Sequence, residues 1–111
     1  MLQIIGTKKC KETAKALRAC KERSIPCQFI NLSERSLSEG EWASLFQSIP
    51  DEDLLDTSSP YYTKQGYQHR VFSTQEELKE HPELLKTPVL RIKGRAHAGF
   101  DLPKLIEWGG L

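Results

Sequence analysis

The chain lacks the features that mark secreted, metal-stabilised or membrane-spanning proteins. It has three cysteines among 111 residues, an odd number, and no two of them form a CxxC pair. Cys10, Cys20 and Cys27 are not spaced as zinc ligands and no histidine cluster completes a set, so we expect no disulfide framework and no metal site. No apolar run approaches membrane-spanning length, and the N-terminus lacks the layout of a signal peptide. We therefore expect a cytoplasmic protein that binds no membrane.

A strong excess of charge of either sign is also missing. The chain has sixteen lysines and arginines and fifteen acidic residues, which gives a formal net charge of +1. This balance provides no overall electrostatic drive toward nucleic acid. The content of 38% hydrophobic and 28% charged residues is ordinary for a soluble globular protein. At this length we expect a single domain over residues 1–111, and a monomer.

The N-terminal third predicts two strands joined by a helix. Residues 2–5 are a short apolar run that suits a buried strand, and residues 10–23 form an amphipathic helical pattern with Ala14, Ala16 and Leu17 facing inward. Ser24-Ile25-Pro26 ends this helix, and residues 27–32 alternate as a second strand does. Such a βαβ unit makes the two strands parallel, with a right-handed crossover.

The middle of the chain, about residues 36–85, predicts a helical insert. Ser38 with Glu41 fits a capping box, and Thr74 with Glu77 caps a later helix. The expected segments are a helix over 38–48, a short helix over 51–55, a loop over Thr57–Tyr62 and a helix over 74–81 that His81-Pro82 ends.

The C-terminal part returns to strands. Residues 88–92 predict a strand, 93–95 a turn, and 96–100 a strand that pairs back as a hairpin. Asp101 is expected to cap a last helix that runs to Trp108. The whole chain therefore predicts an α/β fold with the order βαβ, helical insert, ββα and a four-stranded mixed sheet.

Cys10 is the first candidate for a reactive residue. It follows the first strand and lies at the start of the first helix, where unpaired backbone N–H groups and the helix dipole favour a thiolate. Lys8, Lys9 and Lys11 flank it and act in the same direction. The alternative is that Cys10 is a small buried hydrophobic residue, as isolated cysteines often are.

An ordered set of segments resembles one known family. The segments are Gly6-Thr7-Lys8-Lys9-Cys10, the helical insert, Lys86-Thr87-Pro88-Val89-Leu90 and Gly99-Phe100-Asp101. Together they resemble the arsenate reductase (ArsC)-like family, which includes the Spx-type regulators. The resemblance covers nearly the whole chain and implies a thioredoxin-like fold. It matches Cys10 to the family's nucleophilic cysteine and Pro88 to its cis-proline.

Two departures from the family pattern bear on the substrate. The family's arsenate reductases hold the oxyanion with arginines, whose planar donors suit a tetrahedral anion. The matching positions here are Thr57-Ser58-Ser59-Pro60 and Thr87, which carry no charge. Arg91, Arg95 and His97 are either a substitute source of positive potential or ordinary strand and turn residues. These two departures from the family pattern therefore argue against efficient arsenate reduction.

A third departure bears on the electron donor. Thr13 stands where Spx-type regulators carry the second cysteine of a CxxC switch. It either donates a hydrogen bond to the Cys10 thiolate or lies on the helix surface. Cys20 lies ten residues along the same helix, a rise of about 15 Å, and Cys27 falls at the opposite end of the sheet, so neither is expected to form a disulfide with Cys10. A redox-active Cys10 would need an external thiol.

Two functions remain open at this point. The first is an arsenate reductase-like thiol oxidoreductase that uses Cys10 alone, with glutathione as co-substrate and no bound cofactor. Its partner would be a small-molecule thiol or a protein disulfide. The second is a non-catalytic or redox-sensing regulatory binding protein of the Spx-like type. For the first function, the expected substrate-binding residues are Lys9, Lys11, Thr13, Thr87 and Pro88.

Overall fold

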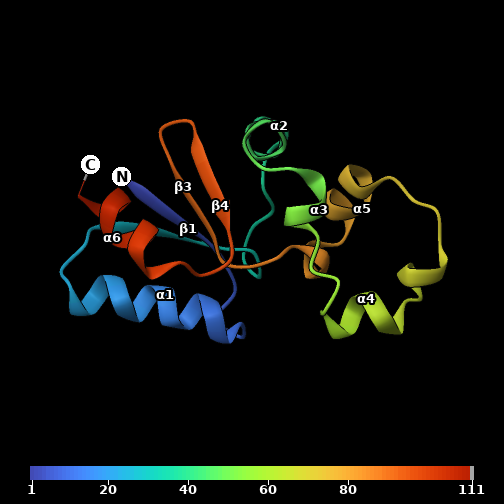
Figure 1. Ribbon diagram of the computed structural model, residues 1–111, viewed down its shortest axis with the longest axis horizontal. Helices are drawn as coiled ribbons and strands as arrows, with labels where there is room; N and C mark the ends of the chain where they lie inside the picture. Colours follow the sequence, from blue (N-terminus) through green and yellow to red (C-terminus); the bar gives the residue numbers. More distant parts are fainter. Residues whose placement is uncertain (111) are drawn as a thin grey trace. The chain divides into compact units, whose positions relative to one another are not determined.

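The computed structural model describes residues 1–110, which divide into two compact units (Figure 1). The first unit contains Met1–Ser36 together with the segment from Thr87 onward, and the second contains Leu37–Lys86. The second unit begins and ends within one residue of the helical insert expected at about 36–85. Each unit is described by itself below.

The first unit contains a four-stranded mixed sheet with the strand order β2-β1-β3-β4. β1 pairs with β2 in parallel and with β3 antiparallel, and β3 pairs antiparallel with β4. This arrangement confirms the fold predicted from the sequence. The last strand begins at Arg95, which was expected in the turn, because Lys93 and Gly94 alone reverse the chain with positive φ. The strands are β1 (Leu2–Gly6), β2 (Cys27–Asn31), β3 (Val89–Ile92) and β4 (Arg95–Ala98).

Helices α1 (Lys11–Glu22) and α6 (Leu102–Gly109) pack against each other and against the same core (Figure 1). The Asp101 side chain accepts a hydrogen bond from the Lys104 N–H at 3.1 Å, which confirms the predicted cap of α6. In the buried core of this unit, alternate residues of the strands pack against one face of α1 and one face of α6. It consists of Leu2, Ile4, Ala16, Ala19, Cys20, Leu90, Ile92, Leu105 and Trp108.

The inward face of α1 differs from the prediction. Ala16 is buried as expected, but Ala14 and Leu17 are only half-buried. The buried positions are Thr13, Ala16, Ala19 and Cys20, which share one helical face at the 3.6-residue period. The prediction chose inward positions by hydrophobicity alone and so did not include Thr13. Thr13 is 0% exposed, so its reading as a helix-surface residue is wrong.

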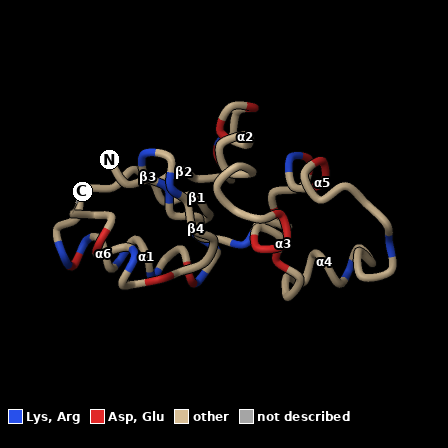
Figure 2. Tube along the Cα trace, turned by 45° about the horizontal axis from the view of Figure 1, so that its top comes forward, with Lys and Arg blue, Asp and Glu red and all other residues tan. Residues whose placement is uncertain are grey.

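The second unit is helical. The capping box at Ser38 is present in full, with the Glu41 N–H on the Ser38 hydroxyl and the Ser38 N–H on the Glu41 carboxylate. Acidic residues gather in the first turn of α3, where the helix dipole favours them (Figure 2). The helical elements are α2 (Glu39–Ser48), α3 (Asp51–Leu54), α4 (Pro60–Lys64), η1 (Tyr67–His69), α5 (Thr74–Glu80) and η2 (Pro82–Leu84).

Two predictions for this unit were wrong in detail. Thr57–Tyr62 was expected to be a loop, but α4 begins at Pro60 because Ser59 caps it by accepting the Tyr62 N–H at 3.3 Å. Helix α5 is capped by Ser73 and not by Thr74, since the Ser73 hydroxyl accepts the Glu76 N–H at 3.4 Å. Where hydroxyl residues stand at consecutive positions, a prediction from the sequence easily places the helix cap one residue away from the true cap.

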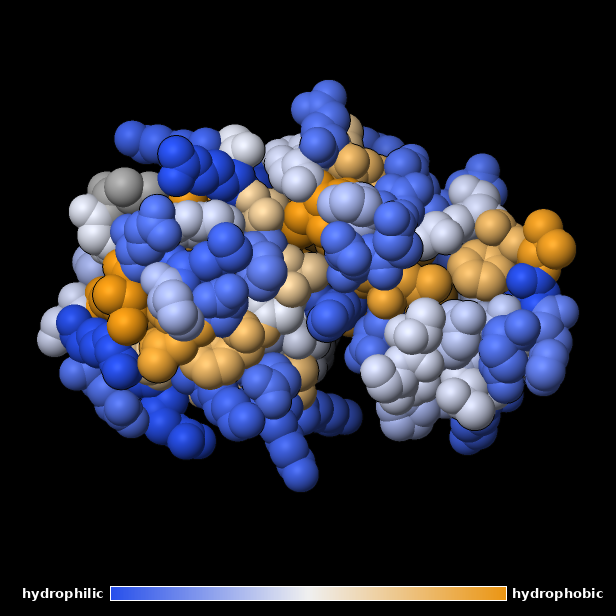
Figure 3. Space-filling view, in the orientation of Figure 1, coloured by the Kyte–Doolittle hydropathy of each residue, from blue (hydrophilic) through white to orange (hydrophobic). Residues whose placement is uncertain are grey.

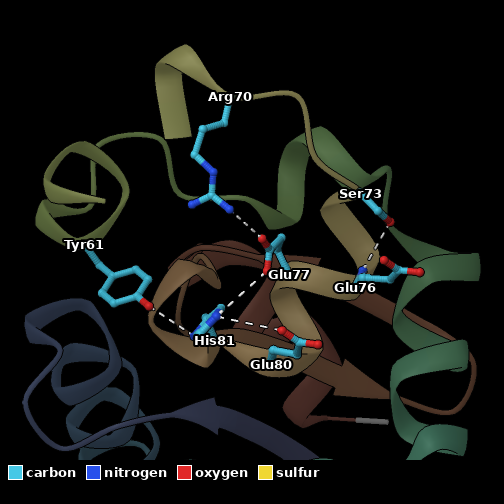
Figure 4. A network of polar contacts seen from close by, with 7 residues as sticks. All are labelled: Tyr61, Arg70, Ser73, Glu76, Glu77, Glu80 and His81. Atoms are coloured by element: carbon cyan, nitrogen blue, oxygen red, sulfur yellow. Dashed lines mark hydrogen bonds and ion pairs between the residues drawn. The ribbon is translucent and has the colours of Figure 1, made fainter. Parts of the chain in front are cut away.

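A polar network links α4 to α5 within the second unit (Figure 4). The Tyr61 hydroxyl lies 3.0 Å from His81 Nδ1. His81 Nε2 lies 3.8 Å from a Glu77 carboxylate oxygen and 3.9 Å from one of Glu80. Arg70 in turn donates to Glu77 at 3.1 Å. These contacts hold the end of α5, at His81, against Tyr61 of α4.

The surface mixes hydrophilic and hydrophobic areas (Figure 3). Within residues 1–110, the large hydrophobic side chains that are exposed are Met1, Val71 and Ile106. None of the described helices has the length and apolar character needed to cross a bilayer.

We predict that Gly6→Ala destabilises the protein by about 1–3 kcal/mol, the usual range for overpacking a tight contact. A Cβ at Gly6 would meet the Thr13 side chain, with Thr13 Cγ2 at 2.8 Å and Thr13 Oγ1 closer still. Chemical denaturation of the two proteins measures the difference. Gly40→Ala is the matched control, since a Cβ there would meet nothing nearer than the Ser38 hydroxyl at 4.0 Å.

The same clash predicts strong coupling between the two positions. Adding Thr13→Ala to Gly6→Ala should recover most of the lost stability, because the crowded atoms are then gone. Additive losses in this double-mutant cycle would contradict the proposed contact.

Candidate functional site

Cys10 occupies the N-cap of α1 and therefore begins the helix without being part of it. Its backbone is extended, with φ −78° and ψ 119°. Its carbonyl accepts the first helical hydrogen bond, from the Ala14 N–H at 3.0 Å, and its own N–H donates to Thr7 at 3.2 Å. The short turn from the end of β1 at Gly6 thus sets the half-buried thiol at the helix N-terminus.

Thr87 makes two contacts with the thiol of Cys10. The Thr87 hydroxyl donates to Cys10 Sγ at 3.0 Å, and Cys10 Sγ donates to the Thr87 carbonyl at 3.7 Å. The peptide bond between Thr87 and Pro88 is cis. Pro88 is fully buried, and its carbonyl accepts the Gly99 N–H at 2.8 Å. A segment 77 residues away in the sequence is thereby fixed beside the sulfur.

The Thr13 hydroxyl is the second polar group beside the thiol. It is fully buried, and among residues 1–110 it meets no partner at full hydrogen-bond geometry. It nevertheless lies close enough to Cys10 to lower the pKa of that thiol. We assign the sulfur as its partner, because a buried hydroxyl left unpaired costs about 1–3 kcal/mol. A thiolate would accept this hydrogen bond more strongly than the thiol does.

The pKa of Cys10 reflects two opposed effects. Partial burial raises the pKa, because it disfavours the charged form. Hydrogen bonds from the hydroxyls of Thr13 and Thr87, and from the backbone N–H groups of Thr13 and Glu12, lower it by more. The net pKa lies below its ordinary value. The first helical turn and the Thr87 segment together favour the thiolate.

The charged residues singled out in the sequence lie in different settings. Lys8, Lys9 and Lys11 are exposed and surround Cys10 in sequence. Arg91 on β3 donates to the Gln3 side chain at 2.9 Å. His97 Nε2 lies 3.8 Å from an Asp101 carboxylate oxygen. The structure therefore brings Cys10, Thr13, Thr87 and Pro88 together, with exposed lysines on either side of the cysteine.

Comparison with known proteins decides the family. The model of the ArsC family matches residues 5–106, which is most of the chain. The chain belongs to the ArsC family. Among curated proteins, none matches it significantly.

Solved structures of ArsC-related proteins share the fold. An arsenate reductase from Vibrio cholerae has a TM-score of 0.78 at 21% identity, covering 96% of both chains. An arsenate reductase (ArsC) related protein from Brucella melitensis has a TM-score of 0.74 at 22% identity, covering 99% of this chain and 95% of that one. A protein titled YffB has a TM-score of 0.85 at 18% identity, covering 97% and 98%. These likenesses extend to the thioredoxin-like mixed sheet and to the insert.

The loop at Thr57–Pro60 has a structural role of its own. The resemblance matches it to a position where arsenate reductases of the ArsC family carry an arginine. Here the Ser59 hydroxyl accepts the Tyr62 N–H and donates to the Glu83 carbonyl at 3.4 Å. Ser59 is also buried, so it serves the start of α4.

One cluster of possible metal ligands lies in the second unit. Glu77, Glu80 and His81 each offer an atom, and these atoms lie within 4.8 Å of one another. Contacts with Arg70 and Tyr61 already engage Glu77 and His81 (Figure 4). We assign no metal to this cluster.

The direct hydrogen bond from Thr87 to Cys10 was not predicted from the sequence. Thr87 was interpreted only as the site of a missing arginine, although a hydroxyl next to the proline matched to the cis-proline was itself a signal. The sequence also left the position of Thr13 open. The glycine at the end of β1, which makes room for a side chain crossing it, could have indicated that Thr13 is buried.

We predict that Thr87→Val raises the pKa of Cys10 and slows its alkylation at neutral pH by about tenfold. The reason is that a hydrogen bond to a charged group is worth about 1.5–3 kcal/mol, and valine keeps the shape of threonine without the donor. Thr87→Ser is the matched control, since it retains the hydroxyl and should alkylate close to the wild-type rate. Equal rates for the valine and wild-type proteins would show that the 3.0 Å contact does not stabilise the thiolate.

Proposed function

We propose that this ArsC-family protein is a monothiol oxidoreductase that exchanges disulfides through Cys10, with glutathione as the external thiol. The observation that carries the proposal is the thiol of Cys10 at the N-terminus of α1, with the Thr87 hydroxyl 3.0 Å from its sulfur. A sulfur in this setting is a nucleophile at neutral pH, and the threonine hydroxyls that donate to it carry no charge.

The first half of the proposed cycle forms a mixed disulfide. The Cys10 thiolate attacks the glutathione sulfur of a mixed disulfide substrate. The Cys10–glutathione bond forms as the substrate S–S bond breaks, and the substrate thiolate leaves and takes a proton from solvent. Donors from Thr87, Thr13 and the first helical turn stabilise the thiolate before attack.

The second half regenerates the enzyme. A second glutathione thiolate attacks the glutathione sulfur bound to Cys10, which releases glutathione disulfide and returns the Cys10 thiolate. Over the whole cycle, the substrate mixed disulfide and one glutathione thiol become the substrate thiol and glutathione disulfide, so one glutathione thiol is consumed for each substrate thiol released. No second protein cysteine takes part, in keeping with Thr13 standing one turn after Cys10.

The uncharged surroundings of Cys10 favour a disulfide over an oxyanion as substrate. Thr87 donates one hydrogen bond and brings no charge, whereas an arginine offers a planar set of charged donors. The backbone beside the cis peptide at Pro88 is held by the Gly99 N–H and offers a fixed edge along which a peptide-like substrate can lie. Lys9 and Lys11 are exposed and supply positive charge for the carboxylates of glutathione.

We predict that Cys10→Ser abolishes the reduction of a glutathione mixed disulfide, because the proposed cycle has no other nucleophile. Turnover is followed by coupling the glutathione disulfide produced to a reductase. Cys27→Ser is the matched control and should retain activity. The wild-type protein should also reduce such a disulfide far faster than it reduces arsenate.

Three results would count against the proposal. Activity that survives in Cys10→Ser would show that Cys10 is not the nucleophile. Arsenate turnover equal to or above disulfide turnover would contradict the substrate class. A Cys10–glutathione adduct that a second glutathione fails to release would contradict the cycle and favour the redox-sensing alternative.

We predict that the double variant Lys9→Gln, Lys11→Gln reduces kcat/KM for the anionic glutathione substrate several-fold at low ionic strength. The effect should fade as salt rises, since these exposed charges act through screened attraction. A neutral disulfide, bis(2-hydroxyethyl) disulfide, should react equally with both proteins. A loss of the same size with the neutral substrate would show that the lysines act on Cys10 and not on the substrate.

A further inference from the structure

Two cysteines outside the Cys10 site lie at the other end of α1. Cys20 lies near the C-terminus of that helix and is only 2% exposed, while Cys27 is the first residue of β2 and is half-buried. Both belong to the same packed region, since Cys27 lies against the hydrophobic cluster that contains Cys20. Both are free thiols in the structure.

The turn between α1 and β2 holds these two residues in place. The Ile25 N–H donates to the Cys20 carbonyl at 2.8 Å, and Ser24 takes a positive φ of 54°. The chain thereby reverses within the six residues 21–26, and Cys27 pairs with Leu2 at the start of the sheet. This reversal brings Cys27 back against the hydrophobic cluster that contains Cys20.

Cys27 packs against the buried cluster that contains Cys20, near enough for its thiol to affect that of Cys20. Burial raises the pKa of Cys20 to about 12, and the neighbouring Cys27 adds to the rise as a charge and as a hydrogen-bond partner. At neutral pH Cys20 therefore keeps its proton. One thiol of the pair is buried and protonated, and the other is reachable from solvent.

We propose that Cys20 and Cys27 are a second redox site, separate from Cys10, which forms an intramolecular disulfide when a low-molecular-weight disulfide oxidises the protein. The pair differs from a lone structural cysteine in having a second cysteine in the same packed cluster and a half-exposed member that can react first. The site does not depend on the function proposed for Cys10.

The oxidation is written with glutathione disulfide as the oxidant. Cys27 loses its proton to solvent and attacks one sulfur of glutathione disulfide; a Cys27–glutathione bond forms and a glutathione thiolate leaves and is protonated. The Cys20 thiol then loses its proton, and its sulfur attacks the Cys27 sulfur and expels the second glutathione. Two protein thiols are oxidised, and one glutathione disulfide becomes two glutathione thiols.

The protonated state of Cys20 makes the second step slow at neutral pH. Only the thiolate attacks, and well below the pKa its fraction rises tenfold for each unit of pH. The conversion of the Cys27 adduct to the disulfide should therefore speed up about tenfold per pH unit on the alkaline side of neutrality. A disulfide formed by attack of a more acidic thiol would not follow this profile.

The test uses the Cys10→Ser protein, so that the Cys10 site cannot contribute. The protein is incubated with glutathione disulfide, remaining thiols are alkylated, and tryptic peptides are analysed by mass spectrometry. We expect a link between the peptides Ala19–Lys21 and Ser24–Arg35 within one chain, and we expect dithiothreitol to remove it. A stable glutathione adduct on Cys27 with Cys20 alkylated, a link between two chains, or no reaction would overturn the proposal.

Two single variants, each made in the Cys10→Ser protein, separate the steps. Cys20→Ala should accumulate the Cys27–glutathione adduct, because the second sulfur is gone. Cys27→Ala should leave Cys20 unmodified under the same conditions. Modification of Cys20 in the absence of Cys27 would contradict the order of attack. The link in the Cys10→Ser protein requires no change to the buried core, so it stands as a test even if either alanine variant folds poorly.

Discussion

The hydrogen bond from the Thr87 hydroxyl to the Cys10 sulfur is the contact on which the account of this protein depends. It joins the N-cap of α1 to the start of the β3 segment, and it exists only because the sheet places β3 next to β1. The hydrogen bond from the Gly99 N–H to the Pro88 carbonyl anchors the residue next to Thr87. The fold thus places uncharged hydrogen-bond donors around the Cys10 sulfur.

Packing behind the sulfur serves the same arrangement. Gly6 ends β1 without a side chain, and Thr13 fills the space that a Cβ would take. The Thr13 hydroxyl is therefore buried beside Cys10, where it lowers the pKa of the thiol. Thr13 stands at the position that is the second cysteine in redox switches of the CxxC type, and here it supplies an uncharged hydrogen-bond donor. Both donors stabilise charge on the sulfur without offering a second nucleophile, which is why the proposed chemistry needs an external thiol.

Much of the fold could be predicted from the sequence because its signals are local. Apolar runs, the Ser38 capping box and the Asp101 cap fix where elements begin, and the βαβ rule fixes two strand directions. The inward face of α1 was predicted only in part, since the burial of Thr13 depends on how closely α1 approaches Gly6 at the end of β1. The position of Cys27 against the cluster that contains Cys20 likewise depends on how the turn at Ser24 closes.

The first measurement to make is the pH dependence of Cys10 alkylation in the wild-type protein, resolved from Cys20 and Cys27 by peptide mass spectrometry. We expect a midpoint clearly below that of a free thiol, about 8.5, because the donors from Thr87 and Thr13 outweigh partial burial. Unfolding the protein should return the midpoint to the free-thiol value. A midpoint at or above that value in the folded protein would show that the geometry at Cys10 does not activate the sulfur and would leave a thioredoxin-fold protein without a reactive thiol at this position.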